Sequence, residues 1–202
     1  MIDKSTLFKL EYGLYLVTTK EDGKDNGMII NSVMQLTDTP LQVAVTINKS
    51  AYSHDIITRT KKLNVCPLTQ SAPFSLIENF GFKSGREHEK FSGINFARSQ
   101  NGLAYLDEYI NSYLSLRVEQ SIDLGSHTMF ICSVSEAKVI NENKTMTYAY
   151  YHAYVKPKQN ASSSKGYVCT ICGYVYEGAS LPDDYICPLC NHSSQYFEKI
   201  EE

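Results

Sequence analysis

The chain has 202 residues, of which 43% are hydrophobic, and its formal net charge is −3. Such a chain lacks the excess of lysine and arginine with which proteins neutralise nucleic-acid phosphates, so we expect no nucleic-acid partner. No apolar run approaches the ~20 residues that span a bilayer, and the first residues lack the apolar core of a signal peptide. The sequence therefore predicts a cytoplasmic protein that does not enter a membrane.

Strand-like segments dominate the first 154 residues. Val43, Val45 and Ile47 alternate with Ala44 and Thr46, which is typical of a strand with one buried face. Further strands are expected at residues 14–19, 28–36, 63–68, 103–106, 114–118 and 128–139. So many strands with few helices indicate a mainly β domain, built as a closed or nearly closed barrel.

Two helices are expected between these strands. The first covers residues 53–61 and has Ser50 or Ser53 available as its N-cap. The second begins at Pro73, because proline suits the first helical position, and ends at Gly81.

A candidate anion site lies where the strand at 43–47 ends and the first helix begins. An ammonium, hydroxyl groups and the free N–H groups of a helix start come together there, and this combination suits a phosphate. The residues concerned are Asn48, Lys49, Ser50, Ser53 and His54. Helix capping and surface charge explain the same residues equally well. None of the eleven glycines belongs to a Rossmann or P-loop motif, so neither kind of nucleotide site is supported.

Two further groups of polar residues are candidates for ligand contacts. Asn31 and Ser32 stand in the middle of an otherwise apolar strand and are costly to bury unless hydrogen-bonded, so they could contact a polar ring or simply pair within the barrel. His127 is expected at the rim of the barrel, where a single histidine is more often structural than functional.

Residues 155–166 are polar and predict a flexible linker to a small domain at 167–202. That domain contains two C-x-x-C motifs separated by fourteen residues, formed by Cys169, Cys172, Cys187 and Cys190. Four thiolates at this spacing predict a tetrahedral metal site, and the metal would stabilise a segment too short to fold alone. Iron and zinc both accept four thiolates, so the spacing leaves the metal open. Cys66 and Cys132 lie in apolar runs and are expected in the core.

The segment from Tyr167 to Cys190 resembles rubredoxin. The similarity rests on Cys169-x-x-Cys172-Gly-Tyr174 and on Cys187-Pro-Leu-Cys190, and its shortened middle is closer to the rubredoxin-like domain of rubrerythrins. Tyr185 stands where tryptophan is common, and Asn191 stands where glycine is usual. The resemblance implies one iron held by four cysteines for one-electron transfer, with structural zinc as the alternative.

Residues 1–154 resemble the flavin reductase and flavoredoxin family. The residues that carry the similarity are Asn26-Gly27-x-x-x-Asn31-Ser32, Asn48-Lys49-Ser50-x-x-Ser53-His54, Phe80-Gly-Phe-Lys83-Ser84-Gly85-Arg86, Lys90-Phe91, Gly125-x-His127 and Met146-Thr-Tyr-Ala-Tyr-Tyr151-His152. This family implies an FMN-binding split β-barrel that forms a homodimer. Fusion to a rubredoxin-like domain is typical of the high-molecular-weight rubredoxins.

The resemblance also implies roles for individual residues. Those expected to bind FMN are Asn26, Met28, Ile29, Ile30, Asn31 and Ser32 around the ring, Asn48, Lys49, Ser50, Ser53 and His54 at the phosphate, Lys83 and Ser84 in a glycine-bordered closing loop, and His127 and Tyr151. The candidate catalytic residues are His127 and His152, near the ring or the entry of the hydride donor. The family usually has Gly-Asp-His where this chain has Gly125-Ser126-His127.

Three functions are therefore weighed. The first is an oxidoreductase that takes electrons from NAD(P)H onto FMN and passes them singly through the iron to a soluble acceptor, for which the resemblance suggests a flavodiiron oxygen or nitric oxide reductase. The second is a free-flavin reductase with a structural zinc knuckle. The third is a flavin–iron electron carrier that another protein reduces.

Overall fold

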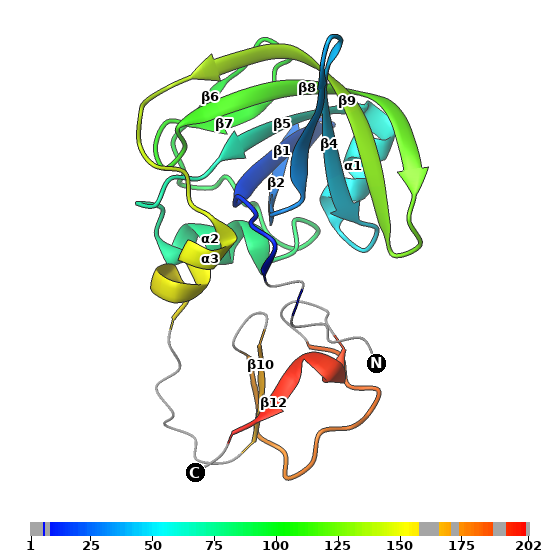
Figure 1. Cartoon of the computed structure of the whole chain (residues 1–202), viewed down its shortest axis with the longest axis vertical. Helices are drawn as coiled ribbons and strands as arrows, with labels where there is room; N and C mark the ends of the chain where they lie inside the picture. The colour runs from blue at the N-terminus through cyan, green and yellow to red at the C-terminus, as the bar shows by residue number, and fades with distance from the viewer. Residues whose placement is uncertain (1–5, 7–8, 158–165, 171–173, 188–192, 201–202) are drawn as a thin grey trace. The chain divides into compact units, whose positions relative to one another are not determined.

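The computed structural model describes residue 6 and residues 9–157, 166–170, 174–187 and 193–200. The chain divides into two compact units, Met1–Val155 and Lys156–Glu202 (Figure 1). Among the helices of the described residues, none is long and apolar enough to cross a membrane.

The first unit is built on a seven-stranded antiparallel sheet, so the prediction of a mainly β fold is confirmed. Its order is β2-β1-β5-β8-β9-β4-β3, which leaves β2 and β3 as the two edges. The strands are β1 (Tyr15–Glu21), β2 (Lys24–Ile30), β3 (Val33–Asp38), β4 (Leu41–Asn48), β5 (Lys62–Pro67), β8 (Ser112–Asp123) and β9 (His127–Val139). The sheet curls into a barrel that is split between its edges (Figure 1).

The single strand expected at 28–36 is wrong, because the chain breaks at Asn31 and Ser32 into β2 and β3. The Ser32 hydroxyl donates to the carbonyl of Thr46 at 2.7 Å, and the Thr46 N–H donates to the Ser32 carbonyl at 3.0 Å. These bonds turn the chain away from β1 and towards β4. An apolar run in the sequence does not reveal such a change of partner, since apolar residues suit either strand.

Two helices lie between the strands, as predicted, but their N-caps differ from the expectation. Helix α1 (Tyr52–Thr60) begins after Ala51, which provides no side-chain cap. Ser50 instead donates to Asn48, and the Ser53 hydroxyl accepts a hydrogen bond from Asn26, so neither serine caps the helix. Helix α2 (Phe74–Gly81) begins one residue after the predicted start, with Pro73 as its N-cap.

The core of the first unit has two apolar clusters. One packs α2 against β1 and β5 through buried residues that include Leu16, Cys66 and Phe80. The other lies around β4, β9 and α1 and includes Ile57 and Phe130. Cys66 and Cys132 are both fully buried, as the sequence predicts.

Several short elements complete the description. The hairpin of β6 (Phe96–Arg98) and β7 (Ala104–Leu106) and the one-turn α3 (Tyr148–Tyr150) with the π-helical turn η2 (Tyr151–Val155) belong to the first unit. The second unit has a three-stranded sheet in the order β11-β10-β12, formed by β10 (Tyr167–Cys169), β11 (Val175–Tyr176) and β12 (Phe197–Lys199), with the 3-10 turn η3 (Ser194–Tyr196). Residues 158–165 of the predicted linker lie outside the described residues.

Candidate functional site

The start of α1 is an open helix N-terminus at the end of β4. The Asn48 side-chain oxygen accepts both the N–H and the hydroxyl of Ser50 at 2.9 Å, and this turn leads into the helix. In the described part of the chain, the N–H groups of Tyr52 and Ser53 have no hydrogen-bond acceptor. The first N–H groups of a helix attract anions because they carry the positive end of its dipole. We call this segment the cradle (Asn48–Ser53), and the anion site expected there stays a prediction.

Two cationic side chains lie beside the cradle, and each is already paired with a carboxylate. Lys49 Nζ lies 2.6 Å from Asp123 Oδ1, and this contact holds the pKa of Asp123 below its usual value. Arg86 Nη2 lies 2.7 Å from Asp55 Oδ2, and its guanidinium lies 5.0 Å from the centre of the Tyr52 ring.

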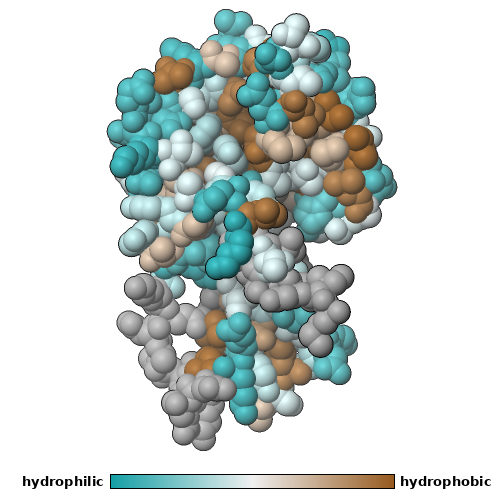
Figure 2. Space-filling model, viewed as in Figure 1, coloured by the Kyte–Doolittle hydropathy of each residue, from teal (hydrophilic) through white to brown (hydrophobic). Residues whose placement is uncertain are grey.

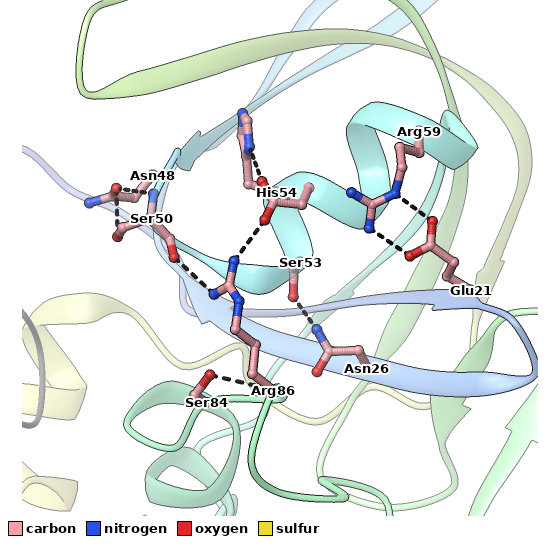
Figure 3. A network of polar contacts seen from close by, with 10 residues as sticks. Glu21, Asn26, Asn48, Ser50, Ser53, His54, Arg59, Ser84 and Arg86 are labelled. Carbon is pink, nitrogen blue, oxygen red and sulfur yellow. Dashed lines mark hydrogen bonds and ion pairs between the residues drawn. The ribbon is translucent and has the colours of Figure 1, made fainter.

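Arg86 was not assigned a role from the sequence, although it ends the loop that contains Lys83 and Ser84. Its Nη1 donates to the Ser50 carbonyl at 3.4 Å, and its backbone N–H donates to the Ser84 hydroxyl at 3.2 Å (Figure 3). The loop is thereby joined to the cradle. The only signal for Arg86 in the sequence was its place directly after the glycine-bordered loop. The spacing of motifs does not show that the Arg86 side chain reaches α1.

The same loop passes very close to β2 at Gly85. Asn26 Nδ2 donates to Ser53 Oγ at 2.8 Å, and both side chains are buried (Figure 3). A side chain at Gly85 would overlap the Asn26 amide oxygen and crowd the Tyr52 ring. Because glycine has no side chain, the loop can approach both Asn26 of β2 and Tyr52 of α1 at this point. Lys83 and Ser84 are exposed on the loop.

The residues expected around a ring lie on β2 and the turn after it. Met28, Ile29, Ile30 and Asn31 are all half-buried, and Ser32 is engaged with β4. Among the described residues, none is hydrogen-bonded to the side-chain amide of Asn31. An amide that is half-buried and unpaired is available to a ligand.

His54 and His127 both lie close to the cradle. His54 Nε2 is 2.9 Å from the Thr128 hydroxyl, and its ring packs 5.6 Å from that of Phe130. His127 pairs with Asn48 in the β4–β9 register, and its Nδ1 lies 2.8 Å from the Ser126 hydroxyl. Ser126 thus contacts the imidazole at the position where the resembling family has an aspartate.

Tyr151 and His152 lie in η2, where Tyr151 belongs to the apolar cluster under α2. His127 is instead the first residue of β9. The His152 ring packs edge-on against Tyr148 at 4.5 Å. Within one subunit the structure therefore brings His54 and His127 to the cradle, while His152 packs against Tyr148 of α3.

Of the four predicted metal ligands, Cys169 and Cys187 are described and both are fully buried. Cys172 and Cys190 lie outside the described residues, and no group of three His, Cys, Asp or Glu side chains around a metal occurs among those described. The Cys169 N–H donates to the Tyr174 carbonyl at 2.8 Å, which pins β10 to the chain after the first C-x-x-C motif. Two buried thiols from separate motifs suit a metal bound by thiolates.

Comparison with known proteins identifies both units. A family model described as flavin reductase like domain matches residues 7–157. The chain belongs to this flavin reductase-like family. A second model, described as rubrerythrin, rubredoxin-like domain, matches residues 167–198. The resemblance inferred from the sequence motifs is confirmed for both parts of the chain.

Relatives include proteins with and without the second domain. The high molecular weight rubredoxin of Moorella thermoacetica is 38% identical over 98% of this chain and 100% of its own length. The ferric-chelate reductase (NAD(P)H) of Archaeoglobus fulgidus is 32% identical over 78% of this chain and 93% of its own. Among solved structures, the flavin reductase PheA2 is 26% identical, with a TM-score of 0.61 over 72% of this chain and 93% of that one.

These relationships determine the cofactors, which are a flavin in the flavin reductase-like domain and iron bound by cysteines in the rubredoxin-like domain. The residues present fit both groups. The cradle offers N–H, hydroxyl and cationic donors that match a phosphate ester. The buried thiols of Cys169 and Cys187 match iron. The protein is thus an oxidoreductase that combines a flavin domain and an iron domain in one chain.

Proposed function

We propose that the protein takes electrons from NAD(P)H and delivers them singly to a soluble redox partner, for which a flavodiiron oxygen or nitric oxide reductase is the candidate. The observation that carries this proposal is the presence of both domains in one chain, which a relative named high molecular weight rubredoxin shares over its full length. Bound FMN can accept two electrons as a hydride and release them one at a time, and thiolate-bound iron carries one electron.

In this proposal the cradle binds the phosphate of FMN. The N–H groups of Tyr52 and Ser53 donate to it, while Lys49 and Arg86 supply positive charge. The Ser50 hydroxyl donates to Asn48 and so holds the turn of the cradle. The Ser53 side chain is buried against Asn26, so it supports the cradle from below while its backbone N–H faces the ligand. His54 is held by Thr128 and stabilises the start of α1.

The segment Met28–Ser32 is proposed to line the ring, with the unpaired Asn31 amide as a polar contact. His127 lies beside the cradle within the same subunit, so we propose that it contacts the flavin. Tyr151 and His152 lie with the α2 cluster, and a homodimer is one way in which they could approach a flavin bound by the partner subunit.

A homodimer is also proposed from exposed apolar residues of the barrel. Met34 is 62% exposed on β3, and Leu41 is 42% exposed at the start of β4. Ile122 and Leu124 of the β8–β9 hairpin are 38% and 52% exposed. Apolar side chains gather on the side of the barrel that carries this hairpin (Figure 2). Exposed apolar patches of this kind mark interaction surfaces.

Anaerobic stopped-flow mixing with NADH or NADPH tests the proposal. We expect the flavin absorption band to bleach first and the ferric–thiolate band to follow. In Cys169→Ser only the flavin phase should remain, because the iron site has lost a ligand. A wild-type protein that contains zinc, or iron that never becomes reduced, would contradict the proposal.

A free-flavin reductase is the second candidate, since several relatives that match 68–79% of this chain are named FMN reductase (NADH). It predicts that flavin reduction with excess FMN is equally fast in wild type and Cys169→Ser, and that a soluble acceptor receives no electrons through iron. A carrier that another protein reduces predicts no bleaching with either nicotinamide.

A further inference from the structure

A buried lysine, Lys90, lies against the strand that is proposed to line the flavin ring. Its side chain is only 5% exposed, and among the described residues no carboxylate pairs with it. Its Nζ donates to the Gly27 carbonyl at 2.9 Å and to the Phe80 carbonyl at 2.8 Å. Burying a lysine without an acidic partner is costly, so these two carbonyls account for its position.

The two carbonyls belong to backbone that has no other partner nearby. Phe80 is in the last turn of α2, where helix carbonyls lack intrahelical donors. Gly27 lies on β2, an edge strand of the sheet. Lys90 therefore connects the end of a helix to the free edge of a strand, in the place where a further strand would otherwise pair.

The alternation of β1 shows which backbone groups of β2 face this free edge. The Leu14 carbonyl accepts the N–H of Leu68, on the β5 side of β1. Because backbone groups alternate in direction along a strand, those of Leu16 and Thr18 also face β5. Their register partners on β2 are Ile29 and Gly27, which consequently turn their N–H and C=O groups away from β1.

Ile29 therefore has an outward-facing N–H and C=O that no described residue fills. Lys90 occupies the same edge one step earlier, at Gly27. The Phe80 ring packs so closely on Gly27 that an added Cβ would lie 3.0 Å from it, and Phe91 packs on Phe80 with 5.1 Å between ring centres. These contacts fix the distance between α2 and the edge of β2.

On the other side of Gly27, the neighbouring residue Asn26 is bonded to Ser53 beneath the cradle. The segment that begins at Met28 is thus held from two directions, at Asn26 by α1 and at Gly27 by Lys90. A shift of the Lys90 contact would move Met28–Ile30 relative to the cradle, and hence the ring site relative to the phosphate site.

We propose that Lys90 is a positioning residue of the flavin site, which holds the free edge of β2 so that the backbone of Ile29 can hydrogen-bond the polar edge of a flat heterocyclic ring. This inference rests on the proposed binding of FMN along β2. It assigns to Lys90 no contact with the flavin, and the effect passes through the Gly27 carbonyl.

The test compares Lys90→Met with Asn79→Ala in the full-length protein. Methionine keeps the approximate length of lysine but cannot donate to Gly27 or Phe80. Asn79 Nδ2 donates to the backbone carbonyl of Lys90 at 2.7 Å, so Asn79→Ala loosens the same segment while the Gly27 contact remains. Urea unfolding of both variants measures the general loss of stability.

We expect Lys90→Met to weaken FMN binding at least tenfold in a fluorescence titration and to alter the absorption band of the bound flavin, with Asn79→Ala changing neither. In the flavin-free protein, the Met28 amide, which by the same alternation faces β1, should exchange with deuterium faster in Lys90→Met only. Equal effects of the two variants, or unchanged binding and exchange in Lys90→Met, would overturn the inference. A wild-type protein that fails to bind FMN would instead refute the proposed function. The deuterium exchange would still show whether Lys90 holds the edge of β2 in place.

Discussion

Raising the pH should stabilise the first unit through Lys90. Burial lowers the pKa of this lysine from its usual value of 10.5 to about 8, because the charged form is removed from water. Between these two pH values the unfolded chain binds more protons than the folded one, so the free energy of unfolding rises with pH. The stability gained by deprotonating Lys90 is therefore complete above pH 10.5 and is lost as the pH falls towards 8.

The size of the effect follows from the two pKa values. Their difference corresponds to about 3 kcal/mol in total, of which about 2 kcal/mol should be gained between pH 7.5 and 9.5. Both hydrogen bonds survive deprotonation, since a neutral amine still has two N–H groups for the carbonyls of Gly27 and Phe80.

Urea unfolding at several pH values, followed by circular dichroism, measures this gain as a difference between variants. Lys90→Met should be less stable than wild type at every pH and should lack the additional rise. Lys24→Met, which removes an exposed lysine of β2, serves as the matched control and should keep the rise. If wild type and Lys90→Met depend on pH in the same way, Lys90 is not the group that titrates and the reasoning fails.

Three further outcomes are expected. Gly85→Ala should cost about 1–3 kcal/mol in urea unfolding, because the new methyl group displaces Asn26 and leaves buried polar atoms unpaired; an unchanged unfolding midpoint would contradict the close approach. Arg86→Gln should weaken FMN binding about tenfold in a fluorescence titration at low salt, with a smaller effect at high salt; equal affinities would remove Arg86 from the phosphate site. Cys66 and Cys132 should resist maleimide labelling in the native protein when peptides are mapped by mass spectrometry, since burial raises the pKa of both thiols, that of Cys132 to about 12; rapid labelling of either would refute this.

Much of the fold could be predicted from local patterns. The alternation of Val43, Val45 and Ile47 identified β4, and proline and glycine marked the ends of α2 to within one residue. These signals are local, because a strand or helix terminus depends on residues a few positions apart. The break at Asn31 was missed because it results from a bond between Ser32 and Thr46 on another strand.

The site could be predicted only in part, for the same physical reason. The cradle was found because its residues are close in sequence and surround a helix start. Arg86 and Lys90 were not assigned, since their roles depend on contacts with Asp55 and Gly27, 31 and 63 positions away. His152 was grouped with His127 by the order of motifs, but motif order does not reveal that His152 packs against Tyr148 while its neighbour Tyr151 joins the cluster under α2.

The ion pairs beside the cradle have a consequence for how the cofactor is held. Asp55 and Asp123 already neutralise Arg86 and Lys49, so under the proposal that FMN binds here an arriving phosphate would exchange places with carboxylates instead of meeting free cations. The electrostatic free energy gained on binding is then the difference between a cation–phosphate contact and the cation–carboxylate contact that it replaces. Because the cations are already neutralised, they attract a distant phosphate only weakly. A departing flavin, in turn, leaves behind a surface that restores its own charge balance, so the barrel can release and recapture its cofactor without passing through a strongly charged state.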